Sequence, residues 1–183
     1  ITNFAGVGGA EMMLARLIQC TEHQYEHVII ALMKTSEVYQ STLDRCQAHY
    51  ALDWNGINTL GTVSKLRTLL KKLQPATVQC WMYHANVLTS LSIIGLAQKP
   101  KVVWGIHHSL ASPKDESIST KIALGLSKIL SQQASAIIYC AHSSMQQHQA
   151  FGFKNANSQV IANGVFLDKF QPNPQLHEPT VIG

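Results

Sequence analysis

The chain has 183 residues, of which 46% are hydrophobic and 13% are charged, and its formal net charge is +4. This length and hydrophobicity predict one globular domain with a sizeable core and exclude a disordered chain. The positive charge favours an anionic ligand or surface, but the 14 Lys and Arg residues are scattered along the chain, so no nucleic-acid partner is expected.

Short apolar runs alternate with longer helical patterns along the sequence. Five runs and a weaker sixth are predicted to be strands, at 27–33, 49–53, 77–82, 101–106, 136–140 and 159–162. A continuously apolar run such as the one from Val28 to Leu32 is typical of a strand that helices cover on both faces of a parallel sheet.

Helical patterns fill the gaps between these runs, at 9–19, 62–73, 85–97, 118–132 and 143–151. In the second of them the apolar positions fall on one arc, and Pro75 ends the pattern. Repeated β–α units predict an α/β fold with a doubly wound, mostly parallel, Rossmann-like sheet and right-handed crossovers.

Both ends of the sequence are typical of one half of a two-domain protein. Only a few residues, beginning with Ile1-Thr2, precede a glycine-rich turn that normally follows a buried first strand. Residues 171–179 contain three prolines, as linkers do, and an apolar run begins at residue 180. We therefore expect a Rossmann-like domain over residues 1–170, and a linker and the start of a second domain over 171–183.

The first candidate site is the glycine-rich turn ahead of the 9–19 helix. Gly8 and Gly9 would let a ligand approach the backbone closely, and a helix N-terminus offers free N–H groups to an anion. Glu11 stands where a dinucleotide-binding fingerprint needs its third glycine, so a nicotinamide-dependent oxidoreductase is a weaker alternative. An ordinary tight turn with Glu11 in the first helical turn would also explain the pattern.

Polar side chains also follow two neighbouring predicted strands. His107 and His108 come at the end of one, and His84 and Asn86 come after the other. The carboxyl ends of parallel strands share one edge, where ligands bind in such sheets. Two adjacent side chains at a strand end point to opposite faces, so we expect one histidine to face the ligand and do not expect both to hold one metal. Structural histidines and a helix cap at Asn86 are the alternative interpretation.

Asn163 and Gly164 follow the weakest predicted strand, and by themselves they indicate a turn. The sequence contains no phosphate-binding P-loop, no nucleophile elbow and no zinc-ligand spacing. We therefore expect neither a metal site nor a tightly bound cofactor.

In order and spacing, these motifs resemble the N-terminal domain of the retaining GT-B glycosyltransferases of family four. The resemblance lies in GVGGAE at 6–11, HH at 107–108 and IANGV at 161–165, and it extends over nearly the whole chain. Two positions depart from the family pattern, because Phe166 replaces an Asp and Ala141 replaces a common Ser. A non-catalytic, degenerate transferase or binding module therefore stays an alternative.

The resemblance implies an enzyme whose active site lies between two Rossmann-like domains, this one on the acceptor side. Gly8 and Gly9 would lie near the donor diphosphate or the acceptor, and His107 would be the catalytic residue that hydrogen-bonds the transferred sugar or the acceptor. The other implied substrate-binding residues are Glu11, His84, Asn86, His108, Asn163 and Gly164. The nucleotide sugar is a co-substrate held mainly by the other domain, and the acceptor is a sugar or lipid-linked chain of polysaccharide, lipopolysaccharide or glycolipid synthesis.

Localisation is inferred from three further features. Four separate cysteines are typical of buried free thiols in a reducing compartment, and no run has the ~18 apolar residues of a membrane span. The sequence therefore predicts a cytoplasmic protein. A peripheral contact with the inner face of the membrane is a further hypothesis, which rests on Lys65, Arg67, Lys71 and Lys72 along one helix face. An ordinary solvated helix face is the alternative.

Overall fold

The structure is a computed structural model that describes residues 1–166, and the predicted linker at 171–183 lies outside the described residues. In chain order its elements are α1 Gly9–Thr21, β1 Val28–Ala31, a 3-10 turn Glu37–Tyr39, α2 Gln40–Leu43, β2 Ala48–Ala51, α3 Thr59–Leu73, β3 Thr77–Trp81, α4 Met82–Ser92, β4 Lys101–Ile106, α5 Ile118–Leu130, a 3-10 turn Ser131–Gln133, β5 Ala136–Tyr139, α6 His142–Phe151 and β6 Ser158–Val160. The predicted alternation of strands and helices is confirmed. The short helix α2 was not predicted, because four residues are too few to show a helical period.

Every strand pair in the described part of the chain is parallel. One group has the order β1-β2 and the other the order β3-β4-β5-β6. Residues 1 and 2 join them, because Leu32 donates its N–H to the Thr2 carbonyl at 2.9 Å and Trp81 donates to the Ile1 carbonyl at 2.8 Å. The combined order is that of a doubly wound sheet, with its switch point between residues 1–2 and β3.

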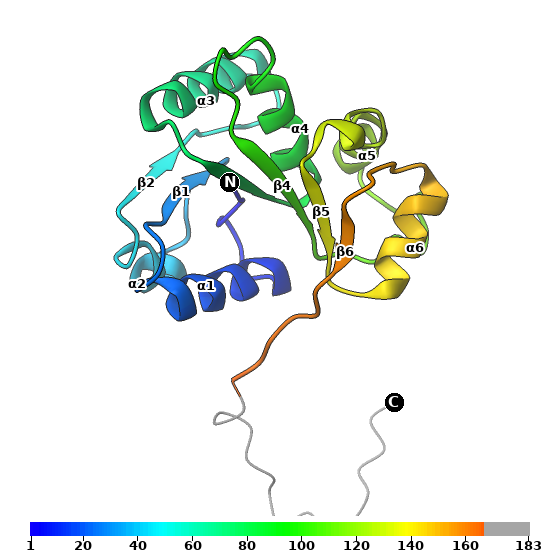
Figure 1. The fold of residues 1–183 in the computed structure, drawn as a ribbon, viewed down its shortest axis with the longest axis horizontal. Helices are drawn as coiled ribbons and strands as arrows, with labels where there is room; N and C mark the ends of the chain where they lie inside the picture. Colours follow the sequence, from blue (N-terminus) through cyan, green and yellow to red (C-terminus); the bar gives the residue numbers. More distant parts are fainter. Residues whose placement is uncertain (167–183) are drawn as a thin grey trace, which may run out of the picture.

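Helices cover both faces of this sheet (Figure 1). The helices α1 and α2 pack on one face around Phe4, Ile18 and Trp81, and we call this the α1 face. On the other face, α3 to α6 pack around a larger core that includes Trp104. The helix α4 packs against both α3 and α5, so most of its side chains are buried. The loops that leave the carboxyl ends of all the strands meet at one edge, which is where the predicted site residues lie.

The start of α4 differs from the prediction. The helix begins at Met82 directly after β3, and not at residue 85. Met82 has a φ of +70°, a left-handed conformation that is uncommon for a residue other than glycine, and it turns the strand into the helix without a loop. Asn86 consequently lies in the second turn of α4, where it cannot act as the helix cap.

The cysteine prediction is confirmed only in part. All four cysteines are free, but Cys80 alone is buried, and Cys20 is exposed. The predicted burial was wrong for Cys20, which lies on α1 away from its buried residues Leu14 and Ile18, and Cys46 and Cys140 are only partly buried. Among residues 1–166, no helix is both long and apolar enough to cross a membrane.

Gly152 ends α6 in a conformation that a side chain would disrupt. Its φ is +115°, and an added Cβ would lie 2.5 Å from Lys128 Cε. We expect Gly152→Ala to lower the free energy of unfolding by about 1–2 kcal/mol in urea denaturation. Gly61→Ala in α3 is the control, because it meets no atom within 4 Å, and it should raise the stability by up to about 1 kcal/mol. Equal effects of the two changes would contradict this account.

Candidate functional site

The glycine-rich turn leads from residues 1–2 into α1 at the carboxyl edge of the sheet. Gly8 is the N-cap residue, with extended backbone, and Gly9 is the first helical residue. A Cβ on Gly9 would meet nothing within 4 Å, so the space in front of this helix end is open there. The Glu11 carboxylate folds back beside Gly8, where an added Cβ would lie 2.4 Å from its Oε2. The turn therefore presents open backbone on the Gly9 side and a carboxylate on the Gly8 side.

Tyr39, in the 3-10 turn before α2, holds the glycine-rich turn in place. Its hydroxyl donates to the Gly6 carbonyl at 3.0 Å, and its ring stacks on Phe4 with centroids 4.3 Å apart. Burial raises the pKa of Tyr39, and the nearby Glu11 charge adds to this. The hydroxyl therefore stays protonated and remains a donor at neutral pH.

His107 lies on the α1 face, just after β4. Its ring stacks on Trp81 with centroids 4.3 Å apart and planes 13° apart. Its Nδ1 lies 3.0 Å from Asn163 Oδ1, and since a carbonyl oxygen only accepts, Nδ1 donates and Nε2 is left as an acceptor. Burial lowers the pKa of His107, and the bond to Asn163 opposes this in part. The imidazole is therefore held neutral with a defined orientation.

Gly105 makes this position of the ring possible. A Cβ on Gly105 would lie 3.4 Å from His107 Nε2 and 3.3 Å from the Cys80 carbonyl oxygen. Because both contacts are tight, a larger residue at this position would displace the imidazole. Gly105 is therefore part of the site.

The chain after β6 supplies the last residues of the site. Asn163 binds His107, and the next carbonyl, that of Gly164, accepts a hydrogen bond from Arg16 of α1 at 3.3 Å. Trp81 packs in the same core as α1 and stacks on His107. His107 is bonded to Asn163, and the next residue, Gly164, is bonded to Arg16 of α1, so the contacts form a closed ring. We call Gly8, Gly9, His107, Asn163 and Gly164, together with Trp81 and Arg16, the rim. The prediction that the glycine turn and His107 lie at one edge of the sheet agrees with this arrangement.

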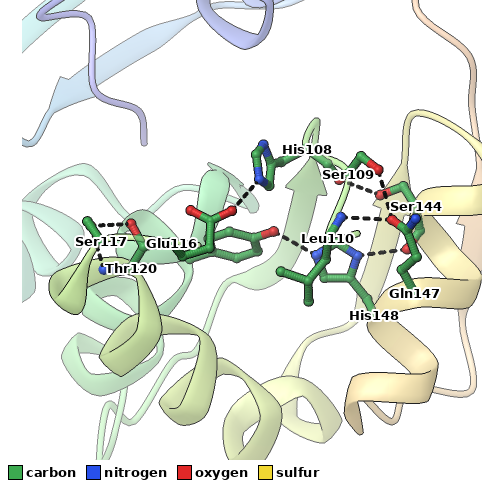
Figure 2. Close-up of polar contacts among 10 residues, drawn as sticks. His108, Ser109, Leu110, Glu116, Ser117, Thr120, Ser144, Gln147 and His148 are labelled. Atoms are coloured by element: carbon green, nitrogen blue, oxygen red, sulfur yellow. Dashed lines mark hydrogen bonds and ion pairs between the residues drawn. The ribbon is translucent and has the colours of Figure 1, made fainter. Parts of the chain in front are cut away.

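His108 points to the other face, as expected for adjacent residues at a strand end. Its Nε2 lies 2.7 Å from Glu116 Oε1, and its carbonyl accepts from Ser144 Oγ at 2.7 Å. Figure 2 shows that Gln147 of α6 faces the same segment. Its Oε1 accepts from the Leu110 N–H at 2.8 Å. His108 therefore fastens the loop after β4 to its surroundings, on the side away from His107.

His84 and Asn86 also lie apart from the rim. His84 packs against Trp54, with ring centroids 5.1 Å apart, and burial lowers its pKa. Asn86 is fully buried, and its side-chain amide has no hydrogen-bond partner among the described residues. The expectation that Asn86 lies at the ligand edge is therefore wrong, because α4 is enclosed between α3 and α5.

Three rim or supporting residues were not predicted from the sequence: Tyr39, Trp81 and Arg16. Their contacts join segments that are distant in the sequence, and no motif links them. For Trp81 a signal was present, since a tryptophan at the end of a strand beside the strand that ends in HH is well placed to stack on a histidine. For Arg16 we find no comparable signal.

The rim is an open surface. Among the described residues, a groove of about 310 Å³ lies between α1 and α2 and is lined in part by Arg16 and Phe166. A hollow of about 430 Å³ lies at the amino ends of β3 and β4, on the opposite edge of the sheet. Neither is lined by Gly9 or His107. Of the rim residues, Gly9, Asn163 and Gly164 are exposed, His107 is half-buried and Trp81 is buried. The described residues include no cluster of His, Cys, Asp or Glu that could hold a metal.

Buried histidines make the stability of the fold depend on pH. His148 is fully buried, accepts a hydrogen bond from the Tyr83 hydroxyl at 2.7 Å, and its pKa is lowered chiefly by burial. As pH falls below the ordinary histidine pKa near 6.5, the unfolded chain takes up protons that the folded chain resists. We expect urea midpoints to fall between pH 7.5 and 5.5, and to fall less in His148→Gln. An unchanged pH dependence in that variant would contradict this role.

Comparison with known proteins gives one family and several similar structures, of which two are complexes of one protein. The model of Glycosyltransferase Family 4 matches residues 7–169. The structure of HepE from Anabaena in complex with UDP has a TM-score of 0.72 and 16% sequence identity to this chain. The HepE complex with UDP and glucose has a TM-score of 0.70 and 17% identity. No curated protein matches the sequence significantly.

These comparisons cover most of this chain but only part of the related one. The two structures align with 94% of this chain and with 46% of HepE, so the chain spans about half the length of the protein that it resembles. At this level of identity the likeness establishes the fold, and the fold is that of one half of a GT-B glycosyltransferase.

Proposed function

This chain belongs to glycosyltransferase family 4, and from that membership we propose that it is the acceptor-side half of a retaining glycosyltransferase. The whole enzyme would move a hexose from a nucleotide sugar to a polysaccharide or glycolipid acceptor. A second domain, which residues 171–183 would reach as a linker and its first residues, would hold most of the donor. No metal or other cofactor is required in this proposal.

The observation that carries the proposal is the rim. It combines an open helix N-terminus at Gly9 with a neutral imidazole at His107, both at the switch point of a parallel sheet. Helix N-termini favour anions such as a diphosphate, and switch points are where doubly wound sheets bind ligands. The related protein HepE was solved with UDP and with glucose, which supports a nucleotide and a sugar as ligands here.

In this proposal His107 binds a sugar hydroxyl through Nε2. Asn163 accepts the hydrogen bond from Nδ1, and Trp81 fixes the plane of the ring by stacking. Nε2, which accepts hydrogen bonds, is therefore already oriented when the substrate binds. Glu11 and the amides at Gly8 and Gly9 would contact the donor or acceptor at the helix end. His108 and Glu116 would shape the loop after β4, and through it the choice of acceptor.

The proposed location is the cytoplasm, with a peripheral contact to the inner face of the membrane where a lipid-linked acceptor is present. Of the four basic residues on which the sequence bases this contact, one is engaged within the protein. Arg67 of the basic α3 face donates to the carbonyls of Ser92 and Ile94 at the end of α4. Only Lys65, Lys71 and Lys72 of that face are therefore exposed.

The test compares this chain with the protein extended by a second domain. Both are incubated with UDP-glucose, other nucleotide sugars and a panel of sugar and lipid-linked acceptors, and the released nucleotide is measured. We expect turnover from the two-domain protein and none from residues 1–183 alone. NMR of the product should show the anomeric configuration of the donor. Robust transfer by the single chain would contradict the division of labour, and an inverted product would contradict retention.

A further inference from the structure

The backbone that carries His107 has left the sheet before it reaches this residue. The strand β4 ends at Ile106, whose carbonyl accepts a hydrogen bond from the Cys140 N–H at 3.2 Å. Beyond it, no backbone–backbone hydrogen bond joins residues 107–110 to any other described residue. Stacking and a hydrogen bond orient the imidazole ring, but they do not hold the backbone from which the ring projects. The hydrogen bonds that hold this backbone therefore come from side chains.

Two side chains of α6 supply these hydrogen bonds (Figure 2). Ser144 Oγ donates to the His108 carbonyl at 2.7 Å, and Gln147 Oε1 accepts from the Leu110 N–H at 2.8 Å. The same Oε1 accepts from the Ser109 hydroxyl at 2.9 Å. The two α6 residues are three positions apart, so they lie on one face of the helix. The path of the chain after β4 is therefore set from α6.

The helix α6 is itself fixed in the core. His148, on the same face, is fully buried, accepts from the Tyr83 hydroxyl at 2.7 Å and donates from Nδ1 to the Ser144 carbonyl at 2.7 Å. Leu110 is buried as well, so water does not readily replace the acceptor of its N–H. A buried N–H without an acceptor is unfavourable. Without Gln147, the segment after β4 would therefore shift until this N–H found another partner.

We propose that Gln147 is a positioning residue for His107. Its side-chain oxygen fixes the backbone after β4, and thereby the place at which the imidazole meets Trp81 and Asn163. Both hydrogen bonds are accepted by Oε1, so a carboxylate can take over this role, whereas an aliphatic side chain cannot. The effect on the ring exists without any substrate, and the effect on transfer rests on the proposed function.

The first test is nitrogen NMR of the histidine rings in the full chain, without donor or acceptor. The spectrum of His107→Ala identifies the signals of His107. In the unmodified protein these signals should show the proton on Nδ1, as the bond to Asn163 requires. Gln147→Leu should abolish the dominance of this tautomer, and Gln147→Glu should restore it.

A purely structural role of Gln147 predicts a different result. Gln147→Leu would then lower the melting temperature but leave the tautomer of His107 unchanged, and this outcome would overturn the proposal. Gln147→Met, which keeps the length of the side chain, replaces the leucine variant if that variant does not fold. The matched control is Gln146→Leu, because Gln146 is the exposed neighbour on the same helix. Its spectrum should equal that of the unmodified protein.

The second test is transfer by the two-domain enzyme. Gln147→Leu should lower kcat about tenfold, which is less than the effect of His107→Ala, because the imidazole is displaced but still present. The KM for the nucleotide sugar should change by less than about twofold, since the other domain would hold most of the donor. Gln147→Glu should recover most of kcat, and equal losses in the two variants would overturn the proposal. If the unmodified two-domain enzyme transfers no sugar, the proposed function fails, and the tautomer of His107 still decides the role of Gln147.

Discussion

Replacing His107 with alanine should lower the transfer rate of the two-domain enzyme by at least about 100-fold, the typical effect of removing a pre-positioned polar group at a reacting centre. The ring is fixed by Trp81 on one side and by Asn163 at Nδ1, so its Nε2 is the group that substrate would meet. The loss should appear as a lower kcat/KM for transfer. Because the ring is half-buried at an open rim, the fold should remain intact in circular dichroism and urea denaturation.

Two further variants separate a direct role of His107 from a structural one. His23→Ala is the neutral control, since the His23 side chain is 90% exposed and lies beyond the end of α1, the helix whose start forms part of the rim. Asn163→Ala should have a smaller effect than His107→Ala, because it frees the orientation of the ring but leaves Nε2 in place. Unchanged activity in His107→Ala would favour a purely structural role of this histidine and would remove the main support for the proposed function.

Gly9→Val should abolish most activity while leaving the fold stable. A Cβ at Gly9 meets no atom within 4 Å, and valine is a better helix former than glycine, so the melting temperature should not fall. The added methyl groups would occupy the open space before the helix N-terminus and keep a ligand from its amides. We expect a loss of about 100-fold in kcat/KM, since displacement of a substrate by about 1 Å can cost that much.

The control for Gly9→Val is Gly61→Val in α3, which also meets no atom within 4 Å and lies outside the rim. Its activity should equal that of the unmodified enzyme. Gly8→Ala should have an intermediate effect, because the Glu11 carboxylate must first move away from the new Cβ. Equal activities of Gly9→Val and Gly61→Val would show that no ligand approaches the start of α1.

Predictions from local sequence agreed with the structure wherever one segment determines its own conformation. The strand at 101–106 was predicted to its last residue, because β4 is a continuous apolar run with helices on both sides of its sheet. The opposite directions of His107 and His108 followed from the alternation of side chains along a strand. The start of α4 was misplaced by three residues, since a left-handed Met82 is not visible in any hydrophobic pattern.

By itself, the sequence determined the order of strands and helices, the parallel sheet and the edge at which the glycine turn and the histidine pair would lie. These follow from periodicity and from the handedness of β–α units, which are local properties. Only the tertiary structure decided which side chains meet there. Asn86 is buried although it follows β3, whose carboxyl end lies at that edge. Trp81, Arg16 and Asn163 orient the site although they are distant in the sequence. Such contacts depend on how layers pack against each other, which no single segment of the sequence encodes.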